Sequence, residues 1–372
     1  MPKTTTSAQP ACEMCTAFTC KGVCETIYAD NNAVGRSITN YVPALFHLER
    51  AAPGDFSEYC NPNADRGPVA SELRSALARR ENVDRHQLVI DGPGLGRMQR
   101  LPTLFGATDV VVATKDFPGF RKAAATSELP LHEISHDEDG FAIDTDKADE
   151  LVSGLDRPIT MVTAPVTNPG QARVSLEFVE AVALANPNGV VVIDPAYAAS
   201  EEQFNRHDAV QLALSFDNVL YMNVAAKDLG ACGARVSWYV ASEALLTALA
   251  ADIDPYPVSL AAARYVRRLA DRPAIVDAIH DVQEASLEIY RNGLAFSNLE
   301  TRIGPGPWAL INLGRYAKAV VEILQEQFDI RVQLQTGNGL GLDGWIRVSA
   351  TVPCEARAVM LGMQFAVAQV RS

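Results

Sequence analysis

The sequence predicts an α/β fold: a mostly parallel sheet with helices on both faces, followed by a smaller α+β lobe. Two observations favour it. Short apolar segments alternate with helical segments of about ten to fifteen residues along much of the chain. After about residue 300, a shorter stretch again alternates strands with helices. Strands that are apolar on both faces are typical of parallel sheets, because helices cover both sides of such sheets.

Six short apolar segments are expected to form the strands of the main sheet. The first of them runs into a glycine turn, and the others are separated by helical patterns. The segments are QLVIDGPGLG (87–96), TDVVVAT (108–114), ITMVTAP (159–165), VVVID (190–194), NVLYMNV (218–224) and RVSWYVA (235–241).

For two of the expected helices, the sequence also indicates where one end lies. SELRSALARRENV (71–83) has apolar positions at helical spacing, and Ser71 is the expected N-cap. SLEFVEAVALANPNG (175–189) ends in an Asn, Pro and Gly stop. A long helical stretch at about 244–296 is expected to leave the sheet domain.

The pattern divides the chain into three parts. We expect an N-terminal arm over 1–40, a large domain over 41–285 and a small domain over 286–372. Part of the N-terminal segment is expected to complete the small domain. The strands expected in the small domain lie in PWALINLG, IRVQLQT and WIRVSATV.

Composition narrows the class of protein. The 372 residues are 48% hydrophobic, enough for a large core and for two domains. The charged fraction of 21% and the mean hydropathy of +0.01 are those of an ordinary soluble protein. A net charge of −13 opposes binding to nucleic acid or to anionic membranes.

The N-terminus and the cysteines indicate the compartment. Residues 1–10 are polar and lack the apolar region of a signal peptide, and no apolar run reaches the roughly 18 residues of a membrane span. Seven cysteines, an odd number, argue against a disulfide framework. We therefore expect a cytoplasmic protein.

Two short motifs follow neighbouring strands and carry reactive side chains. VVVIDPAY (190–197) places Asp194 and Tyr197 at the end of one expected strand. AAKDLGACGAR follows the next strand, with Lys227 at the turn and Arg235 eight positions later. In a parallel sheet, ligands bind at the carboxyl ends of the strands. Either motif alone carries little information, but the two in this order are far more specific.

This set of side chains matches the demands of pyridoxal 5′-phosphate (PLP). The cofactor needs a lysine for a Schiff base and a carboxylate that keeps its pyridine nitrogen protonated. Its phosphate needs backbone N–H groups and an arginine, and its ring needs an aromatic neighbour. The sequence offers a candidate for each demand.

The two motifs resemble those of class I/II aminotransferases, most closely the histidinol-phosphate aminotransferase-like branch. That family has a DEAY motif and, about thirty residues later, SK, a glycine-rich turn and an arginine. The resemblance implies the aspartate-aminotransferase fold (fold type I), with a sheet of the seven-stranded type. It implies that Asp194 pairs with the pyridine nitrogen and Tyr197 with the ring hydroxyl. Lys227 would form the Schiff base, and Arg235 would bind the phosphate.

Further matches follow in the order of the family. EYCNPNADRGPVASELRSALA (58–78) implies that Tyr59 reaches the phosphate of the neighbouring subunit. IDGPGLG (90–96) stands at the phosphate turn, with Gly92 and Gly94. KDFPGF makes Phe117 the stacking ring.

The remaining matches concern the ring hydroxyl of the cofactor and the carboxylate of the substrate. TAPVTNPGQ (163–171) makes Asn168 a partner of the ring hydroxyl, and GWIRVSATV (344–352) makes Arg347 the residue that binds the substrate carboxylate. The fold also implies a homodimer with shared active sites.

Several positions depart from the family pattern. Ala226 and Val224 stand where the family has hydroxyl side chains that bind phosphate, and Pro195 replaces a glutamate. Pro93 offers no N–H to the phosphate turn. These departures predict a specialised branch whose phosphate ligand is missing or supplied from elsewhere.

Two other motifs could indicate a dinucleotide or a metal. GPGLGR (92–97) reads G-x-G-x-G rather than the G-x-G-x-x-G of dinucleotide-binding proteins, and no acidic residue follows at the required position. Four early cysteines could hold zinc or an iron–sulfur cluster, but their spacing fits no standard site and we expect no metal. They are Cys12, Cys15, Cys20 and Cys24.

The sequence thus predicts a PLP-dependent enzyme that acts on an amino acid through a Lys227 Schiff base and a quinonoid intermediate. Aminotransfer is the favoured reaction. A lyase, a cyclase or a carbon–carbon bond-forming enzyme of natural-product metabolism is the alternative. A non-catalytic protein with this fold is a further one.

Overall fold

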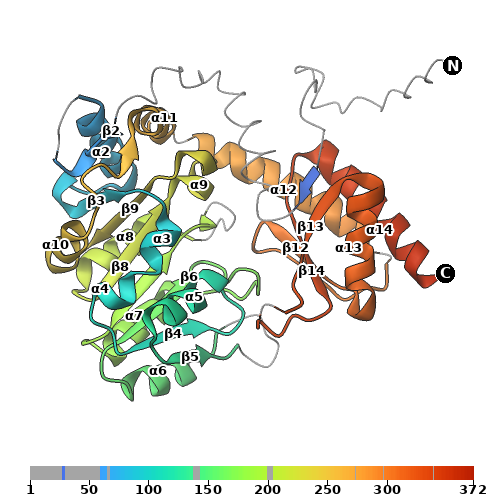
Figure 1. Cartoon of the computed structure of the whole chain (residues 1–372), viewed down its shortest axis with the longest axis horizontal. Coiled ribbons are helices and arrows are strands. Elements are labelled where there is room, and N and C mark those ends of the chain that lie inside the picture. The colour runs from blue at the N-terminus through green and yellow to red at the C-terminus, as the bar shows by residue number, and fades with distance from the viewer. Residues whose placement is uncertain are drawn as a thin grey trace.

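The computed structural model describes residues 27–29, 59–64, 68–136, 143–198, 204–272, 274–295, 297–337 and 339–372. Within these residues the chain forms a large lobe and a smaller one, joined by helix α12 (Figure 1).

A seven-stranded sheet forms the centre of the large lobe, in the order β3-β9-β8-β7-β6-β4-β5. Strand β9 alone runs antiparallel to its neighbours in this sheet, while the others are parallel to one another. The predicted fold class is confirmed. The strands are β3 (Leu88–Asp91), β4 (Asp109–Ala113), β5 (Leu131–Ile134), β6 (Pro158–Thr163), β7 (Val190–Asp194), β8 (Val219–Val224) and β9 (Ser237–Ala241).

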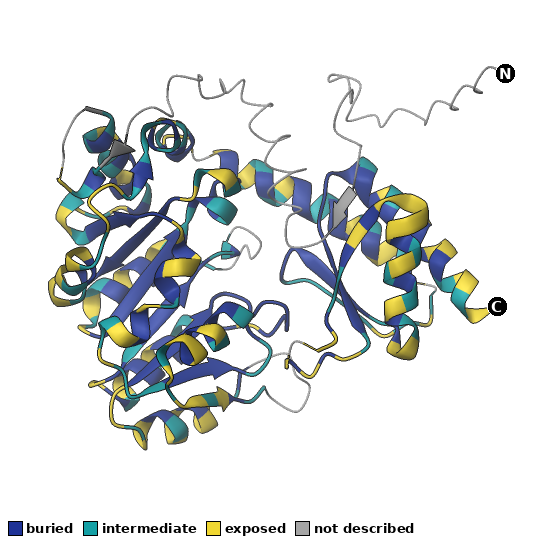
Figure 2. Ribbon diagram, in the orientation of Figure 1, coloured by how far each residue is buried: buried dark blue, intermediate teal, exposed yellow. Residues whose placement is uncertain are grey.

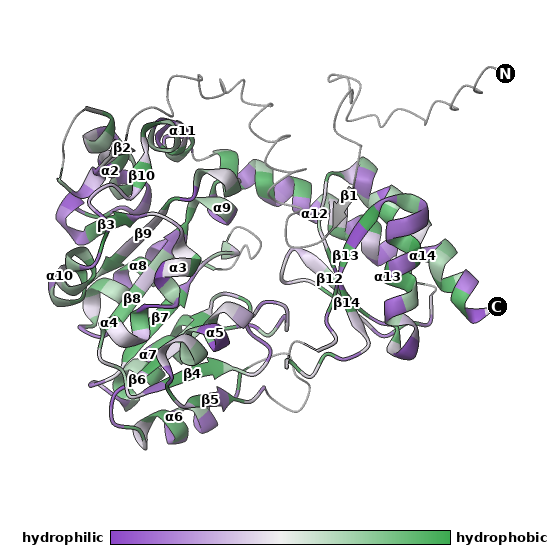
Figure 3. Ribbon diagram, in the orientation of Figure 1, coloured by the Kyte–Doolittle hydropathy of each residue, from purple (hydrophilic) through white to green (hydrophobic). Residues whose placement is uncertain are grey.

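Alternate side chains of these strands enter two separate cores. Val191 and Ile193 of β7 belong to the core on one face, whereas Val192 between them belongs to the core on the other. The period of two residues in a strand sends neighbouring side chains to opposite faces, so a strand buried on both faces must be apolar throughout. Except for the edge strand β5, the strands are accordingly mostly buried and apolar, between more exposed helices (Figures 2 and 3).

Helices of the large lobe cover both faces of this sheet. Side chains of Ser175, Asn205 and Ser259 cap α7, α8 and α11. The helices are α2 (Pro68–Glu81), α3 (Gly94–Met98), α4 (Leu101–Leu104), α5 (Pro118–Ser127), α6 (Thr145–Ser153), α7 (Leu176–Ala185), α8 (Arg206–Ser215), α9 (Ala225–Asp228), α10 (Glu243–Ala251) and α11 (Leu260–Ala270). Short 3-10 turns span Pro62–Ala64, Arg85–Gln87, Cys232–Ala234 and Gly314–Tyr316.

The helix predicted at 71–83 begins earlier than expected. Because α2 starts at Pro68, Ser71 lies inside the helix and is not its N-cap. Its hydroxyl instead accepts a hydrogen bond from Arg85. Proline suits the first turn of a helix, where its missing N–H has no partner to lose.

The long helical stretch predicted at 244–296 is three helices, and only the last one leaves the large lobe. Pro255 and Pro257 interrupt it, since proline cannot continue a helix. Strand β10 (Val258–Ser259) then pairs with β2 (Tyr59–Cys60). Side chains of α10 and α11 belong to the cores of the large lobe. Helix α12 (Ala274–Leu294) begins in that core and ends in the core of the small lobe.

The small lobe is a five-stranded sheet covered by helices, in the order β1-β13-β14-β12-β11. Strand β1 (Ile27–Ala29), from the N-terminal part of the chain, pairs in parallel with β13 at its edge (Figure 1). The other pairings are antiparallel. The remaining elements are β11 (Thr301–Ile303), β12 (Trp308–Asn312), β13 (Ile330–Leu334), β14 (Trp345–Ser349), α13 (Ala317–Phe328) and α14 (Pro353–Arg371).

Among the described residues, no helix combines the length and the apolar character needed to cross a membrane.

Candidate active site

A pocket of about 220 Å³ lies at the carboxyl ends of three neighbouring parallel strands. Thr163 ends β6, Asp194 ends β7 and Val224 ends β8, and all three line the pocket. This edge of a parallel sheet is where ligands bind in open α/β folds. The pocket also brings together seven residues singled out from the sequence: Gly94, Phe117, Asn168, Asp194, Tyr197, Lys227 and Arg235.

Asp194 is a buried carboxylate with few partners in the protein. Its side chain accepts a hydrogen bond from the backbone N–H of Ala196 at 3.0 Å. Burial and then the negative charge of Asp116 raise its pKa to about 7, against the lowering effects of the Ala196 N–H and of Lys227. The group therefore changes its charge near neutral pH.

Tyr197, Asn168 and Lys227 lie beside one another in the pocket. The Asn168 side-chain amide donates to the Tyr197 hydroxyl at 3.1 Å, and both residues are buried. The Lys227 ammonium lies 6.0 Å from the centre of the Tyr197 ring. A hydroxyl, an amide and an amine thus converge on one space at the edge of the sheet.

Lys227 is carried by α9, a short helix that follows β8. The N–H of Ala225 donates to the carbonyl of Val236, which extends the pairing of β8 with β9 into the turn. The next residue after the lysine, Asp228, points into a buried ionic cluster. It accepts from Arg80 at 2.8 Å and 3.0 Å and from Arg206 at 2.6 Å. These bonds tie the lysine turn to α2 and α8.

Glu81 is the second carboxylate of this cluster. It accepts from Trp238 at 2.9 Å and lies 3.7 Å from Arg206. Burial raises its pKa, although the charge of Arg206 opposes the shift. None of these cluster residues was singled out from the sequence, because their partners are more than a hundred positions apart in most of the contacts.

Asp116 is a further carboxylate that the sequence did not single out for this site. It lies between β4 and α5, directly before Phe117. Its oxygens accept from the backbone N–H groups of Phe117 and Asn168 and from both the N–H and the hydroxyl of Thr163. Burial raises its pKa to about 6, while these hydrogen bonds lower it.

Phe117 precedes the first residue of α5, and its half-buried ring lines the pocket. The ring packs edge-on against Phe120, with 5.6 Å between the centroids. A Cβ at Gly119 would lie 2.3 Å from the Phe117 ring, so only glycine permits this position of the ring.

The glycine turn after β3 approaches the sheet closely at Gly94. A Cβ there would lie 2.8 Å from Val224 and 3.0 Å from Met222. Arg235, exposed and in the left-handed region at φ 54°, lines the same pocket. Ala226 also contributes to the wall, so the predicted loss of hydroxyl groups here leaves apolar surface.

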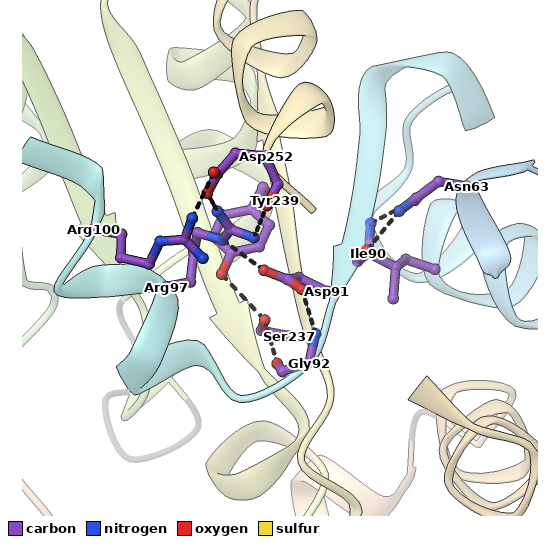
Figure 4. Close-up of polar contacts among 9 residues, drawn as sticks. All are labelled: Asn63, Ile90, Asp91, Gly92, Arg97, Arg100, Ser237, Tyr239 and Asp252. Atoms are coloured by element: carbon purple, nitrogen blue, oxygen red, sulfur yellow. Dashed lines mark hydrogen bonds and ion pairs between the residues drawn. The ribbon is translucent and has the colours of Figure 1, made fainter. Parts of the chain in front are cut away.

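Gly92 lies outside the residues that line the pocket. Its backbone is held by neighbouring side chains (Figure 4). Its N–H donates to Asp91 at 2.7 Å, and its carbonyl accepts from Ser237 at 2.8 Å. Asp91 also accepts from Arg97, which bonds Asp252 as well. The charged network of Asp91, Arg97 and Asp252 therefore fixes the turn on which Gly94 lies.

Arg347 belongs to the other lobe and does not line the pocket itself. It is buried on β14, with its guanidinium 4.3 Å from the centre of the Trp308 ring. Trp308 in turn packs edge-on against Tyr197, with 4.9 Å between ring centroids. One aromatic ring thus separates Arg347 from a pocket residue.

Gln171 joins the two lobes beside this stack. Its amide donates to the carbonyls of Arg302 and Trp308, and its carbonyl accepts from the N–H of Gly306. Trp308 returns a bond from its indole nitrogen to the carbonyl of Pro169. Gln171 was not singled out from the sequence, since nothing local marks it as a contact between lobes.

Other predicted residues lie outside the described part of the chain. The four early cysteines are among them, and so is the side chain of Tyr59. Within the described residues, no group of three or more histidine, cysteine or acidic side chains could hold a metal ion.

Comparison with known families identifies the class of protein that this fold and pocket define. The family model described as "Aminotransferase class I and II" matches residues 57–359. The chain therefore belongs to this family of transferase enzymes, as its motifs predicted.

Individual relatives are distant. "Histidinol-phosphate aminotransferase 2" of Oceanobacillus iheyensis is 24% identical over 243 residues, which is 63% of each chain. The chain spans about half to two thirds of the length of the first curated relatives that it matches.

Solved structures share the fold over nearly the whole chain. Histidinol-phosphate aminotransferase from Sinorhizobium meliloti, in complex with pyridoxal-5'-phosphate, is 18% identical with a TM-score of 0.76, and covers 92% of this chain and 91% of its own. A double mutant of Thermus thermophilus aspartate aminotransferase is 18% identical with a TM-score of 0.71, and the match covers 92% of this chain and 91% of that one. The predicted aspartate-aminotransferase fold is confirmed.

Proposed function

We propose that this chain binds PLP in the pocket at the carboxyl ends of β6, β7 and β8 and transfers the amino group of an amino acid. The observation that carries the proposal is the convergence of Lys227, Asp194, Tyr197 and Asn168 in one pocket of a family aminotransferase fold. The PLP named in the structure from Sinorhizobium meliloti supports the choice of cofactor.

The side chains around the ring position fit PLP. When bound, PLP withdraws electrons from the α-carbon of an amino acid. Asp194 carries or releases a proton near neutral pH and would hold the pyridine nitrogen in its cationic form. Tyr197 and Asn168 would bind the ring hydroxyl, and Phe117 would lie against the ring face.

The part of the pocket where the phosphate of PLP would bind offers fewer partners. Gly94 allows a close approach of backbone, and Arg235 supplies a positive charge. Val224 and Ala226 offer no hydroxyl. We therefore expect PLP binding here to depend more on the ring contacts and on Arg235 than it would in a site whose hydroxyl groups bind the phosphate.

Lys227 would attach the cofactor and then act as a base. Its amine lies in the same pocket as Tyr197, 6.0 Å from the centre of that ring. The Nζ of Lys227 would also be the base that removes the α-proton of the substrate. Asp228 and its two arginines would hold α9 so that this amine stays in place.

Arg347 would orient the substrate by binding its carboxylate. In the stack of Arg347, Trp308 and Tyr197, one buried indole ring lies between this arginine and the pocket residue Tyr197, and this ring would exclude water. The homodimer in which Tyr59 reaches the neighbouring phosphate remains a prediction from the sequence.

The test is a half-reaction with an amino donor alone. PLP-loaded protein mixed with single amino acids should turn into the pyridoxamine 5′-phosphate form and release one equivalent of keto acid. The Lys227→Ala variant should release none. If the loaded protein instead releases ammonia or a side-chain fragment and keeps its PLP, the chain is a lyase or cyclase and aminotransfer is wrong.

A further inference from the structure

Asp116 gathers hydrogen bonds from three separate parts of the pocket wall. Its carboxylate is 1% exposed. One oxygen accepts from the N–H of Phe117 at 2.7 Å, from the N–H of Asn168 at 3.0 Å and from the hydroxyl of Thr163 at 2.7 Å. The other accepts from the N–H of Thr163 at 2.8 Å.

The three residues that supply these four donors all line the pocket. Phe117 directly precedes α5, Thr163 ends β6, and Asn168 lies in the loop beyond it. One carboxylate therefore fixes the backbone of three pocket residues, two of which would contact the ring of PLP. A change in its position would move both of them together.

All four donors are neutral, so they leave the negative charge of Asp116 in place. In the part of the chain that the structure describes, no arginine or lysine forms an ion pair with Asp116 at hydrogen-bonding distance. The charge of Asp116 does act on the pKa of Arg121. The Arg121 guanidinium, however, donates to the carbonyl of Thr114 and pairs with Glu133. The charge of Asp116 also acts on Asp194, whose pKa it helps to raise.

We propose that Asp116 is a positioning residue for the ring of the cofactor. It holds Phe117 and Asn168 against the ring, and its charge adds to that of Asp194 in favouring a protonated pyridine nitrogen. This proposal rests on the function proposed above and goes beyond it, because it assigns a second buried carboxylate to the site.

Several other charged or titratable groups face this pair of carboxylates. Lys227 from α9 lowers the pKa of Asp194, and Asp194 raises that of Tyr239 in β9. Tyr197 and Arg235 line the same pocket. These groups are unchanged in the variants below, except where Asp194 itself is replaced, so differences between variants report on Asp116.

The experiment is a titration of the cofactor-free protein with PLP from about pH 5.5 to about pH 8.5, with the number of protons exchanged on binding measured by calorimetry in two buffers. In the natural protein, the number of protons exchanged on PLP binding should change in a step of about one near pH 7, where Asp194 of the cofactor-free protein titrates. Asp116→Asn should move this step to lower pH by about one unit, the size expected when a nearby like charge is removed. Asp194→Asn should abolish the step.

Thr163→Val is the matched control. It removes the hydroxyl bond to Asp116 and keeps the charge. We expect it to weaken PLP binding about fivefold, the effect of one hydrogen bond, and to leave the step at its natural pH. Asp116→Ser, which keeps an acceptor without charge, serves as a second neutral variant if Asp116→Asn fails to fold.

The outcomes separate the two proposals. A step at the natural pH in both neutral variants of Asp116 would overturn the role assigned to its charge. Unaltered PLP affinity in them would overturn the role in holding Phe117 and Asn168. If the natural protein itself takes up no PLP, the proposed function fails before Asp116 is tested.

Discussion

Asp228, next to Lys227, and the pocket carboxylates Asp194 and Asp116 are all buried, but their pKa values shift in opposite directions. Behind the turn, Asp228 forms ion pairs with Arg80 and Arg206. Burial alone would raise its pKa, but the charges of these two arginines outweigh burial and hold the pKa below its ordinary value. In the pocket, Asp194 and Asp116 are equally buried, yet their hydrogen-bond donors are neutral.

The difference separates scaffold from site. A buried carboxylate that is paired with arginines stays ionised in the folded protein. Removing it leaves the arginines without their partner. A buried carboxylate with a pKa of about 7 keeps its capacity to bind a cation or a proton from a ligand. Although they are adjacent, Lys227 thus belongs to the pocket and Asp228 to the ionic cluster that stabilises the fold.

The largest expected effect comes from breaking the ion pairs of Asp228. Asp228→Asn takes a partner from the buried side chain of Arg80 and from the partly exposed Arg206. It should lower the free energy of unfolding by about 3–5 kcal/mol. Urea denaturation of the cofactor-free variant measures this. Asp271→Asn, which breaks the exposed pair with Arg79, is the control and should change stability by less than about 1 kcal/mol. Equal small effects would contradict the structural role of Asp228.

Replacing a pocket carboxylate should affect function and spare stability. Asp194→Asn should lower the rate of amino-group transfer by about 10²–10³-fold, as loss of a key electrostatic group does in other sites. Its free energy of unfolding without cofactor should not fall, since no buried cation loses its main partner. Single-turnover kinetics and urea denaturation test the two parts. A strongly destabilised variant with normal turnover would reverse the assignment.

The smallest effect concerns pH. The folded-state pKa of Asp194 is about 7 against an ordinary value of 3.8, so between these values the folded protein binds more protons than the unfolded chain does. Its free energy of unfolding must then fall as pH rises through this range. Asp194→Asn, without cofactor, should therefore lose less stability than the natural protein between about pH 5 and about pH 8. Parallel stability curves for the two proteins would show that Asp194 has no raised pKa.

The sequence predicted six of the seven strands of the main sheet, because strands buried on both faces carry their apolar pattern within five or six residues; the partly exposed edge strand β5 lacks this pattern and was missed. It also predicted which strand ends would carry the pocket, since Asp194 ends one such strand and Lys227 follows another. Helix ends were less certain. The prolines at 255 and 257 divide a pattern that looked continuous, and Pro68 starts α2 before Ser71.

The parts that the sequence did not reveal depend on contacts between distant segments. Asp116 bonds Thr163 47 positions later, and Arg80 bonds Asp228 148 positions later. A single aspartate or arginine has no local pattern that distinguishes a surface charge from such a partner. Gln171 illustrates the same limit, because its three bonds cross between lobes.

The most direct test of the account is an absorption spectrum of the purified protein with PLP, followed by borohydride reduction and peptide mapping. We expect the yellow absorbance of lysine-bound PLP and, after reduction, a stable pyridoxyl group on the peptide that contains Lys227. A colourless protein that takes up no added PLP, or a label on another lysine, would contradict the assignment of Lys227 and of the pocket around it.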